Sequence, residues 1–363
     1  MKDNRITFID LFCGCGGITL GLIKNKFDLI CGIDNDAPMI DTFNYNFNGK
    51  GIKGDLRTFK PDDLSKKLCI NNNSVDLIVG GPPCQGFSLA NMWDKVKNDP
   101  RNALFYNFVE YVLFFRPKIF LIENVKGMLS VQEGNVIEAI KKSFKEIGYY
   151  IHEPKILNSM NYAIPQKRER VFIVGTSKPV NFLFPAEKKN ILKVKDAISD
   201  LYHYEGKNDD EPIEYKTKSE STYQKKMRNN SNLIHNHEPR MPAVSTQNKI
   251  SHVGQGGNWK QIPEKYFPNN RKNRHSSAFK RLNENEPSIT IDTGNAHSNY
   301  FHPLYNRIPT VREAARIQSF PDDFIFHGTR TQQYRQVGNA VPPLLMYSIS
   351  KSIKKNIFEN EDS

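Results

Sequence analysis

The sequence predicts an α/β fold, in which helices cover a mostly parallel sheet and a smaller, loop-rich region follows. Residues 1–175 alternate apolar, strand-like runs with helix-like patterns, which is typical of βαβ units. Residues 178–286 are instead polar, rich in Asn, Lys, Pro and Gly, and show no sustained helical period. An apolar helix expected at about 343–357 then returns the chain to the first region.

Each element of the first region is predicted from a local pattern. The expected strands are the apolar runs at 7–12, 29–33, 51–54, 75–79, 118–122, 150–157 and 170–174. The expected helices lie near 17–26, 36–46, 61–69, 102–115 and 134–147. No helical pattern separates the last two strands, so we expect them to form an antiparallel edge. Order is expected to return at 288–291, followed by a helix at 311–318 before the final helix.

Composition excludes several classes of protein. The chain has 363 residues with a mean hydropathy of −0.59. It contains no run of 18 or more apolar residues, which argues against a membrane span. The first strand begins so early that we expect no signal peptide. Five cysteines are too few, and odd in number, for a disulfide framework. These features predict a cytoplasmic protein with two domains.

Positive charge is concentrated in one stretch of the chain. The net charge is +12, and residues 221–281 contain twelve Lys or Arg against Glu238 and Glu264. A concentrated basic segment is typical of a protein that binds a polyanion. The alternative is a solvated, lysine-rich surface without a partner.

A glycine-rich turn joins the first strand to the first helix. It runs from Asp10 to Gly17 and contains Gly14 and Gly16, which permit a tight turn and the close approach of a ligand. Asp34 ends the second strand about 20 residues later, where a carboxylate can accept hydrogen bonds from both ribose hydroxyls. Asp55 follows the third strand and is placed to meet an adenine amino group. The pattern favours a ligand that contains a nucleoside.

Groups suited to covalent catalysis follow the next two strands. Cys84 comes directly after Pro82 and Pro83 at the end of the fourth strand, and Glu123 ends the fifth. Because parallel strands end at the same edge of a sheet, a nucleophile and an acid are expected to meet there. Arg168 and Arg170 stand just before the last strand, where the alternative is an ordinary surface charge run.

The chain resembles the DNA (cytosine-5) methyltransferases over nearly its whole length and in the order of their motifs. Six segments carry the resemblance, namely Phe8–Gly21, Pro82–Gln85, Glu123–Val125, Gln166–Arg170, Arg312–Pro321 and Gln336–Pro342. The resemblance implies a Rossmann-like sheet that binds S-adenosylmethionine and a smaller target-recognition domain. It implies a catalytic domain at 1–177 and 335–363 and a recognition domain at 178–334. Within the recognition domain, residues 288–334 contain family motifs and lead the chain back to the catalytic domain.

The resemblance also implies roles for individual residues. Cys84 would add to C6 of a flipped-out cytosine, Glu123 would bind N3, and Arg170 with Arg168 would hold the base carbonyl or a nearby phosphate. The implied cofactor contacts are Phe12, Gly14, Gly16, Gly17, Ile33, Asp34, Asn35, Asp55, Leu56, Pro83, Leu104, Asn339, Ala340 and Val341. Asn35 stands where the family often has an aromatic residue. The expected DNA contacts are Gln85, Ser88, Arg101, Arg271, Lys272 and Arg274.

The implied partner is double-stranded DNA. We expect a monomeric modification enzyme of bacterial or phage type that acts in the cytoplasm, associated with the nucleoid. A companion restriction endonuclease is possible, but we expect no direct contact with it. No metal site is expected, because Cys13 and Cys15 have no second pair at ligand spacing.

Two alternatives remain open at this stage. A related branch of the family methylates tRNA, but it has proline at the position of Gly86 and lacks a large basic insert. The chain could also be a DNA-binding module without activity, although Cys84, Glu123 and both arginines are present.

Overall fold

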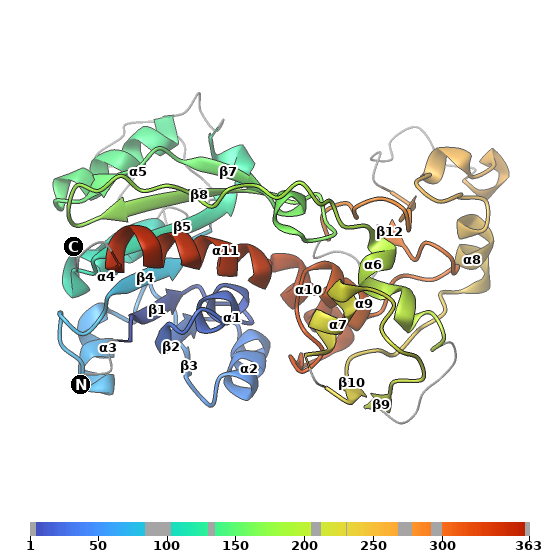
Figure 1. Cartoon of the computed structure of the whole chain (residues 1–363), viewed down its shortest axis with the longest axis horizontal. Coiled ribbons are helices and arrows are strands. Elements are labelled where there is room, and N and C mark those ends of the chain that lie inside the picture. Colours follow the sequence, from blue (N-terminus) through green and yellow to red (C-terminus); the bar gives the residue numbers. More distant parts are fainter. Residues whose placement is uncertain are drawn as a thin grey trace. The chain divides into compact units, whose positions relative to one another are not determined.

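Two compact units make up the chain in the computed structural model (Figure 1). The structure describes residues 5–83, 103–129, 135–204, 212–229, 231–267, 278–291 and 300–359. The first unit comprises 1–158, 169–187 and 343–363, and the second comprises 159–168 and 188–342. Among the described residues, no helix is long and apolar enough to cross a membrane.

The unit boundaries differ from those expected at 177/178 and 334/335. Residues 335–342 group with the second unit because α10 (Arg330–Asn339) packs on α9 (Val311–Ile317). Residues 159–168 also group with it, since the side-chain amide of Gln166 donates to Gln318 and its backbone bridges Ser288. The segments 159–168 and 335–342 therefore pack with the rest of the second unit.

The first unit is built on a mostly parallel sheet, as predicted. Its strands are β1 (Thr7–Leu11), β2 (Asp28–Asp34), β3 (Gly51–Lys53), β4 (Leu77–Gly80), β5 (Ile119–Val125), β6 (Tyr150–Ile151), β7 (Lys155–Asn158) and β8 (Glu169–Thr176). Their order is β3-β2-β1-β4-β5-β8-β6, with β7 also paired to β8. The pairs from β3 to β5 are parallel, whereas β8 runs antiparallel to β5, β6 and β7. The expected antiparallel edge is confirmed, although the predicted strand at 150–157 is divided into two.

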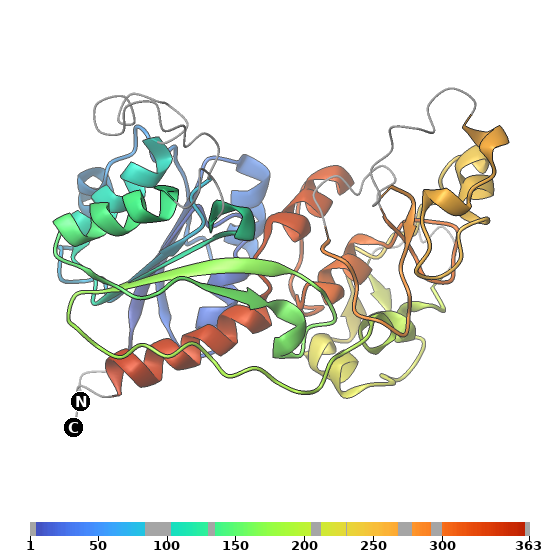
Figure 2. The same cartoon turned by 90° about the horizontal axis from the view of Figure 1, so that it is seen from above.

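Helices cover both faces of this sheet, with α4 and α5 on one side and α11 on the other (Figure 2). The helices of the unit are α1 (Gly17–Ile23), α2 (Ala37–Asn46), α3 (Pro61–Leu68), α4 (Ala103–Phe115), α5 (Asn135–Glu146) and α11 (Pro343–Ile353). Under α4 and α5, the rings of Phe108, Phe120 and Phe144 contact one another in a fully buried cluster. The predicted return of the C-terminal helix is confirmed, because α11 packs directly on α1 at Gly21.

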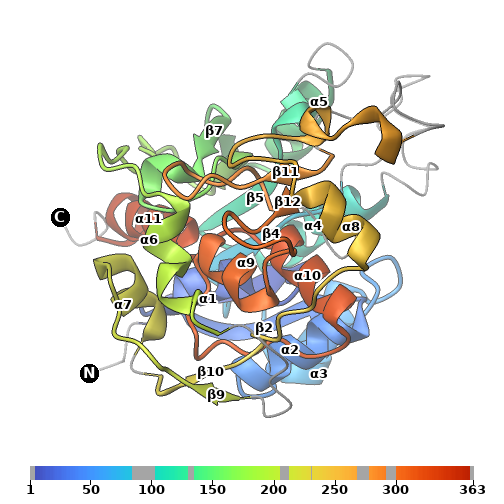
Figure 3. The ribbon, with the colours of Figure 1, turned by 90° about the vertical axis from the view of Figure 1, so that its right-hand side faces the viewer.

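The second unit consists of short elements joined by loops, as its composition predicts (Figure 3). They are α6 (Val194–Ile198), β9 (Ile213–Glu214), α7 (Thr222–Arg228), β10 (Leu233–Ile234), α8 (Val244–Ile250), β11 (Lys280–Arg281), β12 (Tyr300–Phe301), α9 and α10. The segment 288–291, where order is expected to return, contains no strand. Only Ser288 forms a bridge there, to Gln166, while Ser288 and Ile291 are buried by loop contacts.

A carboxyl group is buried inside β1, beneath the glycine-rich turn. Asp10 is fully buried, and its Oδ2 accepts a hydrogen bond of 2.6 Å from the Thr19 hydroxyl on α1. Burial raises the pKa of Asp10 from 3.8 to about 7, and the hydrogen bond from Thr19 opposes this rise only in part. The folded protein therefore keeps Asp10 protonated over a pH range in which the unfolded chain ionises it.

We predict that Asp10→Asn alters how stability depends on pH. Because the folded-state pKa lies above the unfolded value, the wild-type protein loses stability as the pH rises from about 4 to about 7. The contribution of Asp10 to this slope is about 1.4 kcal/mol per pH unit. Urea unfolding at several pH values measures the free energy of unfolding of both proteins. The value for the variant should rise relative to that of the wild type between about pH 4 and pH 7, and the difference should be constant above this range. A stability difference independent of pH would contradict the assignment.

Candidate active site

The predicted site residues of the first unit gather at one edge of the sheet. Strands β1 to β5 are parallel and end at this edge, whereas β8 is antiparallel and begins there. The turn after β1, the carboxylates after β2 and β3, and the acid of β5 therefore share the edge with the first residues of β8. Ligands of open α/β sheets bind outside the carboxyl ends of the strands.

Backbone geometry at the β1–α1 turn requires glycine. Gly14 and Gly16 have φ angles of +53° and +99°, and Phe12 also has a positive φ of 60°. A β-carbon on Gly16 would lie 2.2 Å from the ring of Phe47, so no side chain fits. Gly17 begins α1, and the amide of Cys13 donates to the carbonyl of Ile33 at 3.0 Å. The turn is thus fixed against the end of β2.

Asp34 ties this turn to the end of β2. Its Oδ2 accepts a hydrogen bond of 2.9 Å from the Gly14 amide, and its Oδ1 accepts one of 3.0 Å from the Asp36 amide. Burial raises the pKa of Asp34, while the backbone hydrogen bonds favour the charged form. Each carboxylate oxygen has two lone pairs, so both can accept a further hydrogen bond from a ligand hydroxyl. The neighbouring Asn35 is exposed.

Asp55, after β3, is held by an arginine two residues further on. The Arg57 Nε lies 3.0 Å from both carboxylate oxygens of Asp55, and its backbone amide donates to Oδ1 at 3.0 Å. These contacts hold the pKa of Asp55 below its usual value, so the group remains an acceptor. The predicted apolar contacts Ile33 and Leu56 are buried in the core, and Leu104 is half-buried beside it.

Glu123 and Arg170 form an ion pair across the β5–β8 junction. The Arg170 Nε donates to Glu123 Oε1 at 2.9 Å, and both side chains are mostly buried. The pairing register places Arg170 opposite Val125, two residues from Glu123 on the same strand. On the other side of the carboxylate, a β-carbon on Gly81 would lie 3.0 Å from Oε2. The structure brings together two of the four predicted catalytic residues, and any side chain at position 81 would crowd the carboxylate.

The chain that leads to Cys84 is anchored at this same position. The side-chain amide of Asn124 donates to the carbonyl of Pro82 at 2.8 Å, and Pro83 is exposed. This contact joins the residue after Glu123 to the segment two residues before Cys84. The predicted residues Cys84, Gln85, Ser88, Arg101, Arg271, Lys272 and Arg274 lie outside the described residues.

Four other predicted site residues belong to the second unit. Arg168 is completely buried there, and its guanidinium donates to the carbonyls of Ile291 and Asn339 at 3.4 Å. Asn339 ends α10, and Ala340 and Val341 follow it. Within the first unit, Arg170 is the arginine that pairs with Glu123. The predicted roles of Arg168, Asn339, Ala340 and Val341 stay predictions.

The cysteines around the glycine-rich turn have the character of core residues. Cys13, Cys15 and Cys31 are buried, and burial raises the pKa of each thiol. Thiols in this state are poor nucleophiles and poor metal ligands. Among the residues that the structure describes, no group of three or more His, Cys, Asp or Glu could hold a metal ion.

A model of the C-5 cytosine-specific DNA methylases matches residues 6–355 of the chain. The chain belongs to this family. It is a DNA cytosine-5 methyltransferase, as the resemblance of its motifs implies. Its similarity extends to the type II methyltransferase M.DdeI of Desulfomicrobium norvegicum, at 36% identity over 98% of this chain and 90% of the relative. M1.HphI of Haemophilus parahaemolyticus is 35% identical over 96% of this chain and 87% of its own.

A solved structure has the same fold. It is described as a DNA modification methyltransferase encoded within a prophage (E. coli), and it superposes with a TM-score of 0.79 at 25% identity. The match covers 97% of this methyltransferase and 99% of that chain. The predicted α/β architecture is therefore confirmed.

Sequence reasoning missed three features of the site. Arg57 holds Asp55, Asn124 anchors Pro82, and Gly81 makes room for Glu123. A sequence signal existed for each, since all three residues lie within two positions of a predicted site residue. The sequence does not disclose which side chain points at which neighbour.

We predict that Gly81→Ala lowers the turnover number of the methyltransferase without unfolding it. The added β-carbon would lie 3.0 Å from Oε2 and shift the flexible end of Glu123 by a few tenths of an ångström. Because a displacement of about 1 Å in a reacting group can cost about 100-fold in rate, we expect a smaller loss of about 10-fold or less. Gly127→Ala is a matched control, because a β-carbon there meets nothing within 4 Å. Steady-state methylation assays and thermal unfolding should show a slower but stable Gly81→Ala and a normal Gly127→Ala. Equal rates in both variants would show that the position of the carboxylate is not limiting.

Proposed function

We propose that this methyltransferase transfers a methyl group from S-adenosylmethionine to C5 of a cytosine in a specific duplex DNA site, through a covalent bond between Cys84 and C6. The observation that carries the proposal is the Glu123–Arg170 ion pair beside the anchored Pro82 segment. The ion pair holds the carboxyl group of Glu123 at the sheet edge, next to the Pro82–Pro83 segment that directly precedes Cys84 in the sequence. The relatives named as type II methyltransferases support modification of a specific site alongside a restriction endonuclease.

The residues at the sheet edge fit S-adenosylmethionine. The Asp34 carboxylate keeps acceptor capacity for two ribose hydroxyls, and Asp55 is held as an acceptor suited to the adenine amino group. The turn at Gly14 has open space, since a β-carbon there would meet only the Met39 sulfur, at 3.9 Å. When bound, this cofactor supplies an electrophilic methyl group on a sulfonium.

The chain's own groups would activate the base. Cytosine C5 is a poor nucleophile until a thiolate adds to C6, and Cys84 is placed in sequence to do so. Glu123 would hold N3 and draw electron density from the ring, while Arg170 keeps the carboxylate in position through its 2.9 Å contact. After methyl transfer, loss of the C5 proton and elimination of Cys84 restore the aromatic ring and the free thiol.

The target base must leave the DNA helix for this chemistry. A thiol cannot reach C6 inside a stacked duplex, so the cytosine must be flipped out at a cost of about a few kcal/mol.

We predict that Cys84→Ala abolishes methylation and leaves binding of S-adenosylmethionine unchanged, because the thiol acts only on the base. Duplex DNA that contains 5-fluorocytosine should trap the wild-type protein as a covalent adduct, since fluorine at C5 cannot leave as a proton does. Radiolabelled methyl transfer and denaturing gels measure the two outcomes. Continued turnover by Cys84→Ala would exclude Cys84 as the nucleophile.

For Glu123→Gln we expect turnover to fall by about 100- to 10,000-fold, the contribution typical of a positioned acid. The affinity for duplex DNA should change little, because the amide has nearly the same shape as the carboxyl. Single-turnover rates and DNA binding separate the two effects. If binding collapses while the rate per bound complex stays normal, Glu123 has a structural role instead.

A further inference from the structure

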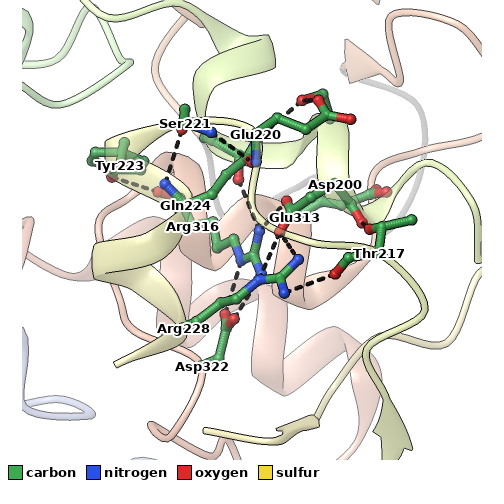
Figure 4. Close-up of polar contacts among 12 residues, drawn as sticks. Asp200, Thr217, Glu220, Ser221, Tyr223, Gln224, Arg228, Glu313, Arg316 and Asp322 are labelled. Carbon is green, nitrogen blue, oxygen red and sulfur yellow. Dashed lines mark hydrogen bonds and ion pairs between the residues drawn. The ribbon is translucent and has the colours of Figure 1, made fainter. Parts of the chain in front are cut away.

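Buried charges fix helix α9 at the centre of the second unit (Figure 4). Arg316 on α9 is fully buried, and its guanidinium donates to Asp200 Oδ1 at 2.5 Å and to Asp322 Oδ2 at 2.7 Å. Arg228 on α7 donates to the other oxygen of Asp200 at 2.6 Å. Separating the members of a buried ion pair leaves charges without compensation, which is strongly destabilising. The end of α9 is therefore held in place relative to the rest of the unit.

Two fully buried glutamines meet at this end of α9. Gln318 directly follows the helix, and Gln166 belongs to the segment before β8. The Gln166 Nε2 donates to Gln318 Oε1 and, at 3.4 Å, to the carbonyl of Ile317, while its Oε1 accepts a hydrogen bond of 3.2 Å from the Ile291 amide. The Gln318 Nε2 donates to the carbonyl of Ala340 at 2.5 Å. We call Gln166 and Gln318 the glutamine pair.

Each amide of the glutamine pair fits in only one orientation, because an amide has an acceptor at one end and donors at the other. Gln166 turns its oxygen to the Ile291 amide, so it offers donors to Gln318. Gln318 must then turn its oxygen to Gln166 and its own donors to Ala340. Reversing either amide would place two donors or two acceptors against each other in a buried site, which is costly. The pair therefore favours one position of the Ala340 carbonyl.

The turn between α10 and α11, residues 339–342, is bound from the inside by two side chains. Gln318 donates to the carbonyl of Ala340, and Arg168 donates to the carbonyl of Asn339 at 3.4 Å. A helix leaves its last carbonyls without partners of its own, so these side chains satisfy groups at the end of α10. Asn339 itself is exposed. The backbone of the α10–α11 turn is thus fixed on its inner side, while Asn339 remains accessible to a ligand.

The α10–α11 turn leads directly to the helix that follows the glycine-rich turn. Pro343 begins α11, and its carbonyl oxygen lies so close to α1 that a β-carbon on Gly21 would be 2.6 Å from it. Gly21 is four residues, or about 6 Å along the helix axis, from Gly17, where α1 begins. The chain therefore passes from the α10–α11 turn to α1 near the sheet edge at which we propose that the cofactor binds.

We propose that Gln318 is a positioning residue for the cofactor: held at the end of α9 and oriented by Gln166, it fixes the α10–α11 turn in the conformation that binds S-adenosylmethionine. The proposal rests on the proposed function, since it concerns the cofactor of that enzyme. Gln318 acts through the carbonyl of Ala340 and is not itself a ligand of the cofactor.

Gln318→Met in the full-length protein removes both polar contacts of this side chain. Without them, we expect the α10–α11 turn to hold its binding conformation in about a tenth of the molecules, which raises the apparent Kd for S-adenosylmethionine about 10-fold. Gln224→Met is a matched control. Gln224 is also fully buried in the second unit, and its Nε2 donates to the Lys195 carbonyl at 3.0 Å and to Ser199 Oγ at 2.9 Å, away from the α10–α11 turn.

Isothermal titration calorimetry with S-adenosylmethionine, at a temperature at which all proteins are folded, measures these affinities. We expect both variants to lose thermal stability but only Gln318→Met to lose affinity. Equal affinities in the two variants would give Gln318 a purely structural role and overturn the proposal. The double variant Gln166→Met/Gln318→Met should bind no more weakly than Gln318→Met, because Gln166 acts through Gln318. Additive losses would contradict the coupling within the glutamine pair.

If Gln318→Met does not fold, hydrogen exchange in the wild-type protein decides the question. Coupling is reciprocal, so binding of the cofactor must stabilise the glutamine pair by the factor by which the pair favours binding. We expect saturating S-adenosylmethionine to slow exchange of the Ile291 amide, which donates to Gln166, about 10-fold. The Gln224 amide, which donates to Ser221 Oγ at 3.0 Å, should exchange at an unchanged rate. Unchanged exchange at Ile291 would overturn the proposal, whereas a wild-type protein that binds no S-adenosylmethionine would refute the proposed function.

Discussion

The antiparallel pairing of β8 with β5 is the constraint on which the site depends. In a wholly parallel sheet, the start of every strand lies far from the catalytic edge. Because β8 is reversed, its first residues reach the edge at which β5 ends, and the register sets Arg170 opposite Val125. Arg170 can then donate to Glu123 at 2.9 Å, although 47 positions separate them. The Asn124–Pro82 hydrogen bond extends the same arrangement to the segment before Cys84.

The two units are stabilised in different ways. The first relies on apolar contact between the sheet and its helices, around Phe108, Phe120 and Phe144. The second also buries apolar side chains, among them Ile317 and Phe320, but it adds a network of buried charges formed by Arg316, Asp200 and Asp322. Such pairs are costly to desolvate but specify one set of neighbours, since each charge requires its partner. A unit with many loops gains a defined fold in this way.

Most of the first unit could be predicted from the sequence, because buried strands and amphipathic helices leave strong patterns. The predicted strands and helices lie close to the observed ones. Glu123 was expected at the end of β5 and Arg170 near the start of β8, but their ion pair was not predicted. The sequence alone does not show what residues 288–291 form, because a short apolar run is also compatible with the observed loop that packs against Gln166. The contacts of Arg168 could not be predicted either, since they depend on carbonyls more than 120 positions away. Tertiary contacts of that range leave no local pattern.

Identification of the methylated nucleoside tests the central claim most directly. The purified methyltransferase is incubated with duplex DNA and S-adenosylmethionine that carries an isotopically labelled methyl group. The DNA is then digested to nucleosides, which are separated by chromatography and identified by mass spectrometry. The account predicts that the label appears in 5-methyl-2′-deoxycytidine and depends on Glu123 and Cys84. Label on a nitrogen of cytosine or adenine, or in tRNA with none in DNA, would contradict it.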